Sequence, residues 1–133
     1  LMHSGESLTP YLTAAAAAVE KRLAKKTVCF NGRPTPAART MHTIFRKFYA
    51  GRIQPYLSRV HRQGRSYLAL MNRLAQQDEA PEAFLVYRTT QLRLKNPQGP
   101  WALFEQAIQH HAQTWQRLFE QCGLSAAGPS PAR

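Results

Sequence analysis

Apolar residues recur at spacings of three and four along most of the chain, which is the pattern of amphipathic helices packed around a core. Helix starts are marked by Thr9-Pro10 and by Thr35-Pro36, and Gly123 marks the last stop. Gly51 and Pro55 interrupt the pattern and predict a break or kink between about Ala50 and Gln54. The pattern therefore predicts five helices, at roughly residues 9–27, 36–50, 54–76, 81–94 and 101–122.

These helices predict an all-α fold, a single bundle over residues 9–123. A chain of 133 residues with 44% hydrophobic content suits one compact domain. Residues 1–8 precede the first cap, and we expect a flexible N-terminus or tag remnant there. Residues 124–133 are mostly Ser, Ala, Gly and Pro, which predicts a disordered tail.

The predicted helix at 54–76 separates apolar from basic positions most clearly. At 100° per residue its apolar seam falls within about 100°, and four arginines occupy a sector of about 120° on the other side. The seam comprises Leu57, Val60, Gly64, Tyr67, Met71 and Leu74, and the arginines are Arg59, Arg62, Arg65 and Arg73. One face is thus expected to pack while the other presents guanidinium groups to solvent. Gly64 lies in the seam, where it would let a neighbouring helix approach closely.

The net charge of +11 is confined to one region of the chain. The 57 residues from Lys21 to Gln77 hold thirteen basic side chains and no acidic one, whereas the rest of the chain holds five basic and seven acidic. A solvated surface normally mixes both signs, so this stretch indicates an anionic partner and excludes a basic one. Arginine outnumbers lysine thirteen to five. A guanidinium group can donate two hydrogen bonds to one phosphate in a bidentate way and an ammonium group cannot, so the excess of arginine favours phosphate as the ligand.

The candidate nucleic-acid-binding residues all come from this basic region. They are Arg33, Arg39, Arg46, Lys47, Arg52, Arg59, Arg62, Arg65 and Arg73. The turn at 31–39 is either a phosphate site at a helix N-terminus or an ordinary helix start. Tyr49, Tyr56 and Tyr67 either stack on unpaired bases or belong to the core.

Catalysis is not expected. General acid–base chemistry needs converging carboxylates or a histidine beside an acid, and the basic region has no carboxylate. His110-His111 lacks the spacing of a zinc helix, and His111 falls on a core position, so neither a metal nor another cofactor is predicted. Cys29 and Cys122 are too few for a disulfide-dense scaffold, and we interpret them as core thiols in a reducing, cytoplasmic compartment. No stretch approaches the roughly 20 apolar residues of a membrane span.

We therefore predict a non-catalytic subunit that contacts the phosphate backbone of single-stranded DNA or RNA and takes part in a larger complex. In size, in its helix-only pattern and in its arginine-striped faces, the whole chain resembles the small helical subunits of CRISPR effector complexes. That resemblance implies a scaffold in an antiviral ribonucleoprotein, in which neighbouring copies stack along guide RNA and DNA.

Two alternatives remain open. Lys95-Asn96-Pro97 ahead of an aromatic helix is similar to turns in replication initiators, which suggests a plasmid or phage replication accessory domain. The other alternative is of a different class, a module that binds acidic proteins or membrane surfaces.

Overall fold

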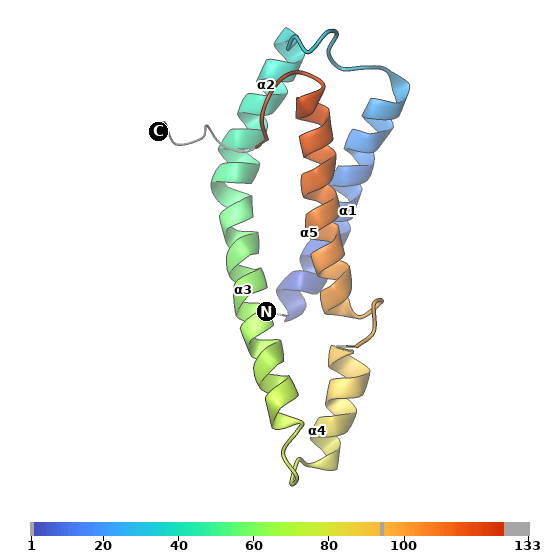
Figure 1. Cartoon of the computed structure of the whole chain (residues 1–133), viewed down its shortest axis with the longest axis vertical. Coiled ribbons are helices and arrows are strands. Elements are labelled where there is room, and N and C mark those ends of the chain that lie inside the picture. The colour runs from blue at the N-terminus through green and yellow to red at the C-terminus, as the bar shows by residue number, and fades with distance from the viewer. Residues whose placement is uncertain (1, 94, 127–133) are drawn as a thin grey trace.

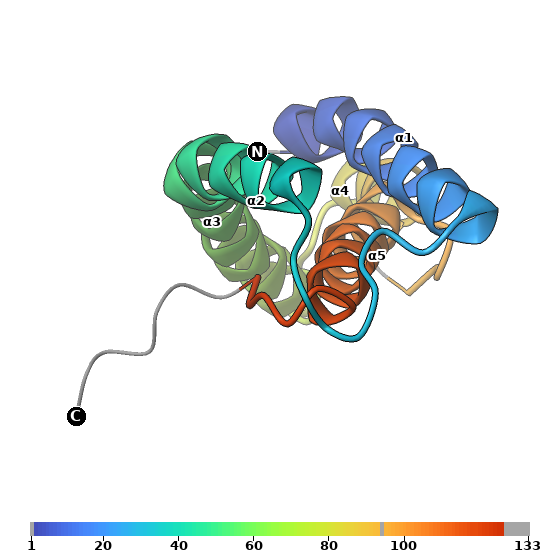
Figure 2. The same cartoon turned by 90° about the horizontal axis from the view of Figure 1, so that it is seen from above.

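The computed structural model describes residues 2–93 and 95–126, and within them it confirms the all-α fold and contains no β-strand (Figure 1). The helices are α1 (Met2–Lys25), α2 (Pro36–Ile44), the π-helical segment η1 (Phe45–Ile53), α3 (Gln54–Leu74), α4 (Glu82–Tyr87), the π-helical segment η2 (Arg88–Leu92) and α5 (Pro100–Glu120). Figure 1 shows α1 crossing behind α5, and Figure 2 shows α1, α5 and the long helix that contains α2 and α3 arranged around a common centre.

The segments α2, η1 and α3 form one continuous helical rod, so the described residues hold four helices where about five were predicted. Of the break or kink expected between Ala50 and Gln54, the break is absent, because the helix continues and widens there: the Gln54 amide donates to the carbonyl of Tyr49, five residues back. A wider turn moves the preceding carbonyls away from the Pro55 ring, which would otherwise clash with the carbonyl four residues earlier. Residues 36–74 thus make a rod of roughly 55 Å.

Helix α1 begins at Met2, seven residues before the predicted start, so the expectation of a flexible N-terminus is wrong for residues 2–8. Thr9 does not cap a helix; its hydroxyl donates to the Gly5 carbonyl at 2.7 Å inside α1. Met2 and Leu8 pack against the core, and Gly5 is buried against the ring of Phe104. This apolar burial outweighs the start signal at Thr9-Pro10.

The core consists of two clusters along α5. The lower cluster joins α1, α3 and α5 and comprises Leu12, Leu57, Val60, Leu68, Leu92, Trp101, Phe104 and Ala107. The upper cluster joins the loop after α1, the top of the rod and the end of α5, and comprises Val28, Cys29, Ala38, Phe45, Leu118, Phe119 and Cys122. Each end of the rod is therefore anchored by its own cluster.

Cys29 and Cys122 form a disulfide, so the interpretation of them as core thiols is wrong. The bond ties the loop before α2 to the end of α5, and both cysteines are buried in the upper cluster. Disulfides persist mainly in oxidising compartments, so the cysteines no longer support a reducing one. None of the described helices combines the length and the apolar content that crossing a membrane requires.

Residues 124–126, the first three of the predicted disordered tail, are ordered. Leu124 and Ala126 pack against the upper cluster, and His42 Nε2 donates to the Ser125 carbonyl at 2.8 Å. Residues 127–133 of the predicted tail lie outside the described residues.

Candidate polyanion-binding surface

Eight of the nine predicted binding residues lie on the rod, and Arg33 lies in the loop before it. Arg46 is half-buried and the other eight are exposed. The ion pairs among the described residues use only Glu20 and Glu105, with Arg117, His110 and His61 as their partners. Within the described residues, no ion pair neutralises any of the nine predicted binding residues. Asp78, Glu79 and Glu82, at and just before the start of α4, form no ion pair with these nine.

The basic side chains wrap around the rod and do not form one narrow stripe. On one flank, Lys47, Arg52 and Arg59 lie beside exposed aromatic rings. On the other flank, Arg65 borders a hollow next to Trp101 and Glu105 of α5. We name the eight rod residues Arg39, Arg46, Lys47, Arg52, Arg59, Arg62, Arg65 and Arg73 the basic surface.

The buried face of α3 agrees largely with the predicted seam. Leu57, Val60 and Gly64 are buried, and the Trp101 indole lies directly against Gly64, as the prediction of a close approach requires. Leu68 is buried in place of Leu74, which is exposed. The arginines of α3 therefore lie off the packing face.

Tyr49, Tyr56 and Tyr67 were predicted either to stack on bases or to belong to the core. In the structure they fall into two groups. Tyr49 packs between Phe45 and His111, with ring centroids 5.0 and 4.5 Å away, and burial raises its pKa. Tyr67 packs against the lower cluster; burial raises its pKa, and the neighbouring Tyr87 hydroxyl adds to the effect. Tyr56 alone is exposed, at 39%, so base stacking remains a prediction only for this tyrosine.

At the spacing of a regular α-helix, Met41, Ile44, Phe45 and Phe48 fall on one face, so the apolar pattern predicts Phe48 as a core residue beside Phe45. In the structure Phe45 is buried, whereas Phe48 is 45% exposed. Each residue of a π-helix turns through a smaller angle than in an α-helix, so η1 shifts the inward face towards Phe45 and Tyr49. The exposure of Phe48 could have been predicted only from a sequence signal for the π-helical segment η1, and the sequence contains no such signal.

The turn ahead of α2 contains the side-chain cap of an ordinary helix start, which leaves the phosphate-site alternative untested. Asn31 and Gly32 take positive φ angles of 53° and 64°. The Thr35 hydroxyl accepts a hydrogen bond from the Ala38 amide at 3.2 Å, which satisfies one of the free amides of the helix end. Arg33 stays exposed beside it, so phosphate binding at this turn remains a prediction.

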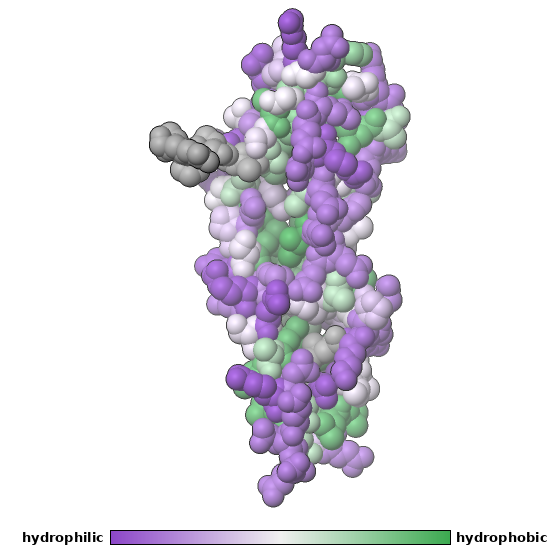
Figure 3. Space-filling model, in the orientation of Figure 1, coloured by the Kyte–Doolittle hydropathy of each residue, from purple (hydrophilic) through white to green (hydrophobic). Residues whose placement is uncertain are grey.

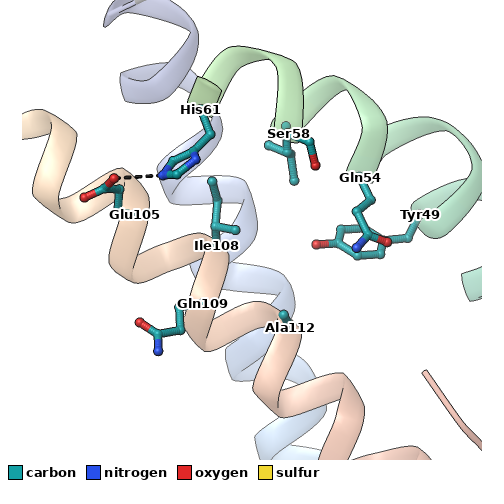
Figure 4. Close-up of a pocket in the computed structure, with 9 residues that line it drawn as sticks. Tyr49, Gln54, Ser58, His61, Glu105, Ile108, Gln109 and Ala112 are labelled. Carbon is teal, nitrogen blue, oxygen red and sulfur yellow. Dashed lines mark hydrogen bonds and ion pairs between the residues drawn. The ribbon is translucent and has the colours of Figure 1, made fainter. Parts of the chain in front are cut away.

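A hollow of about 410 Å³ lies between the rod and α5 (Figure 4). Tyr49, Gln54 and Ser58 line it from the rod, and His61 Nε2 lies 2.8 Å from Glu105 Oε1 of α5 across its end. Apolar side chains show between hydrophilic ones on this face of the molecule (Figure 3). The His61–Glu105 pair was not predicted, because 44 residues separate its members and no sequence signal links them.

His111 is a core residue, as its position in the sequence predicted. It is 4% exposed, and its Nε2 accepts a hydrogen bond from Trp115 Nε1 at 3.0 Å. Burial lowers the pKa of His111 to about 4, and the charge of His110 contributes, so the ring is neutral at pH 7. Its buried Nδ1 has no hydrogen-bond partner among the described residues, and the ring lies against that of Tyr49. Within residues 2–93 and 95–126, no three His, Cys, Asp or Glu side chains gather where they could hold a metal ion.

Residues 1–126 match the model of a family described as protein of unknown function (DUF3080). The chain belongs to the DUF3080 family. No curated protein and no solved structure matches it. The DUF3080 match covers both core clusters, the disulfide and the whole basic surface, so all of these are features of a region assigned to this family.

Proposed function

We propose that this chain is a non-catalytic module that binds the phosphate backbone of a nucleic-acid strand through the basic surface. One observation carries the proposal: eight cationic side chains line a single rod, and in the described part of the chain no carboxylate is paired with any of them. Of the acids that form ion pairs, Glu20 on α1 pairs with Arg117 and His110, and Glu105 on α5 pairs with His61 of the rod, next to the hollow that Arg65 borders, so neither is paired with the basic surface.

Unpaired cations spread around one rod lower the stability of the fold through mutual repulsion, which an anionic ligand relieves. Arg62 and Arg73 of the basic surface are exposed and lie off the seam, so they are free to contact phosphates without disturbing the core. Binding to phosphates releases counterions, and the affinity should therefore depend steeply on salt.

The disulfide changes the proposed compartment. The Cys29–Cys122 bond is buried and joins two parts of the fold that are far apart in sequence, which is typical of proteins from oxidising compartments. We therefore propose such a compartment in place of the cytoplasm. A CRISPR scaffold would work in the reducing cytoplasm, so we retain backbone binding and set that assembly aside.

An anionic membrane surface is a second candidate ligand, and one observation favours it. Ile44, Phe48 and Ile53 are exposed on the rod, by 53, 45 and 43%, beside Lys47 and Arg52. Apolar side chains interleaved with cations are typical of helices that lie on anionic bilayers. The disulfide fits this candidate as well as the first.

Titration at several salt concentrations tests both candidates. We would measure fluorescence anisotropy of a labelled 20-nucleotide single strand, a duplex of the same length, and sedimentation with phosphatidylglycerol vesicles. Six phosphate contacts on a single strand predict a slope of roughly −4 in a log–log plot of affinity against salt.

A charge-matched pair of variants locates the ligand on the molecule. Arg59→Gln, Arg62→Gln and Arg73→Gln together should reduce the slope by about 2, because three phosphate contacts are lost. The control carries Lys21→Gln, Lys25→Gln and Lys95→Gln, which remove the same charge from exposed positions off the rod. Equal losses of affinity in the two triple variants would refute a binding surface on the rod.

A further inference from the structure

Two aromatic rings on the rod are exposed and lie among cations. Lys47 Nζ is 5.4 Å and Arg52 Cζ is 5.7 Å from the centroid of the Phe48 ring. About two turns further along, Arg59 Cζ is 5.8 Å from the centroid of the Tyr56 ring. Each ring therefore has a guanidinium group close enough for a cation–π interaction.

The described fold does not account for the exposure of these rings. The inward aromatic positions of η1 are filled by Phe45 and Tyr49, which pack on Trp115 and His111. Phe48 and Tyr56 are absent from both core clusters, and the Tyr56 hydroxyl donates to Ser4 Oγ of α1 at 3.4 Å. Lys47 and Arg52 lie over the Phe48 ring and Arg59 lies over the Tyr56 ring, so a base stacked here would lie on the exposed ring area next to these cations, an arrangement that suits a ligand both flat and anionic.

The spacing of the rings indicates which form of nucleic acid fits. Phe48 and Tyr56 are eight residues apart, which corresponds to about 12 Å along a helix. Stacked bases in a duplex rise by about 3.4 Å and offer no open faces to two such rings. A single strand has unstacked bases and can place one on each ring, while the phosphates between them meet Arg52 and Arg59.

We infer that Phe48 and Tyr56 form a base-stacking platform, so that the ligand of the basic surface is a single-stranded nucleic acid. This inference rests on the proposed function, to which it adds the strand form and two contact residues. The flanking cations hold the backbone and the rings hold the bases, which gives affinity with little dependence on base sequence.

Substitutions of four exposed apolar residues on the rod can distinguish base stacking from insertion into a bilayer. The four are Ile44, Phe48, Ile53 and Tyr56. Base stacking needs aromatic rings, so it depends on Phe48 and Tyr56 only. Insertion depends on buried apolar area of any kind, and therefore also on Ile44 and Ile53, which are exposed to a similar extent. The variant pair Phe48→Leu with Tyr56→Leu removes both rings and keeps the surface apolar, and Ile44→Ala with Ile53→Ala is its matched control.

The experiment compares a labelled 20-nucleotide oligothymidine with an abasic strand of the same length and charge. We expect the wild-type chain to bind oligothymidine more tightly than the abasic strand by about tenfold for each ring. The double leucine variant should bind both strands equally, with an unchanged salt slope and an unchanged far-ultraviolet circular dichroism spectrum. The isoleucine control should behave as the wild type.

Each other outcome overturns a stated part of the reasoning. Equal wild-type affinity for the two strands would overturn the stacking platform and leave phosphate binding intact. Binding to phosphatidylglycerol vesicles but to neither strand, weakened in the isoleucine control, would overturn the platform and the nucleic-acid proposal together. Tighter binding to a duplex than to oligothymidine would also overturn the platform, while the proposed function would stand.

Discussion

Replacing Gly64 by alanine tests the packing of the rod on α5. Gly64 is buried in α3, and the Trp101 indole of α5 lies directly on it. A Cβ atom at this position would lie 2.0 Å from Cη2 of Trp101 and 2.4 Å from its Cζ3. Ordinary contact between carbon atoms needs about 3.5 to 4.0 Å, so the indole would have to move by roughly 1.5 Å.

Two opposing contributions decide the sign of the effect. Alanine is better than glycine inside a helix by about 1 kcal/mol, which would stabilise the variant. Against this, Trp101 is only 7% exposed and packs on Phe104 and His61, at centroid distances of 5.3 and 5.9 Å, so it has little room to retreat. Overpacking of this kind costs about 1 to 3 kcal/mol, and more where a rigid ring must move. We expect Gly64→Ala to lower the free energy of unfolding by about 1 to 2 kcal/mol.

Urea unfolding followed by circular dichroism measures this change. The double variant Gly64→Ala with Trp101→Phe removes the atoms that clash, so its loss should be smaller than the sum of the two single losses. If Gly64→Ala alone were as stable as the wild type or more so, the close approach of α5 to α3 would be wrong.

Further predictions concern the disulfide and the buried histidine. Cys29→Ser with Cys122→Ser should cost about 4 to 5 kcal/mol, because the bond closes a loop across a sequence separation of 93 residues, and reduction of the wild-type chain should give the same urea midpoint. Because the folded-state pKa of His111 is about 4 and its usual pKa is 6.5, the unfolded chain binds a proton at this residue between these two pH values and the folded chain does not. His111 should therefore lower the free energy of unfolding by up to about 3 kcal/mol as the pH drops from 6.5 to about 4, with no further change below. His111→Gln should remove that part of the pH dependence; an identical pH profile for wild type and variant would contradict it.

The helical periodicity predicted most of the fold. The seam through Leu57, Val60 and Gly64 is visible in the sequence because α3 is a regular helix that packs along its whole length. The start of α1 was misjudged because a local cap signal at Thr9 competes with the burial of Gly5 against Phe104, and that burial depends on a residue 99 positions away. The disulfide was missed for the same reason, since nothing near either cysteine in the sequence identifies its partner.

The sequence predicted which basic residues belong to the candidate surface, but it did not predict which aromatic side chains are exposed beside them. The exposure of arginines such as Arg62 and Arg73 follows from the α3 pattern, because they lie opposite the seam. The exposure of Phe48 does not, since a π-helical segment changes the angle between successive residues without any change in residue type that would indicate it. One such segment therefore converts an expected core ring into a candidate contact.

The Cys29–Cys122 bond makes the chain between those residues a covalent ring that contains all nine candidate binding residues. A single cut by a protease in that stretch opens the ring without releasing a fragment. Both pieces would migrate together on a non-reducing gel and separate only after a thiol is added. A nicked molecule would thus keep its rod attached to α5 in any environment that leaves this bond oxidised.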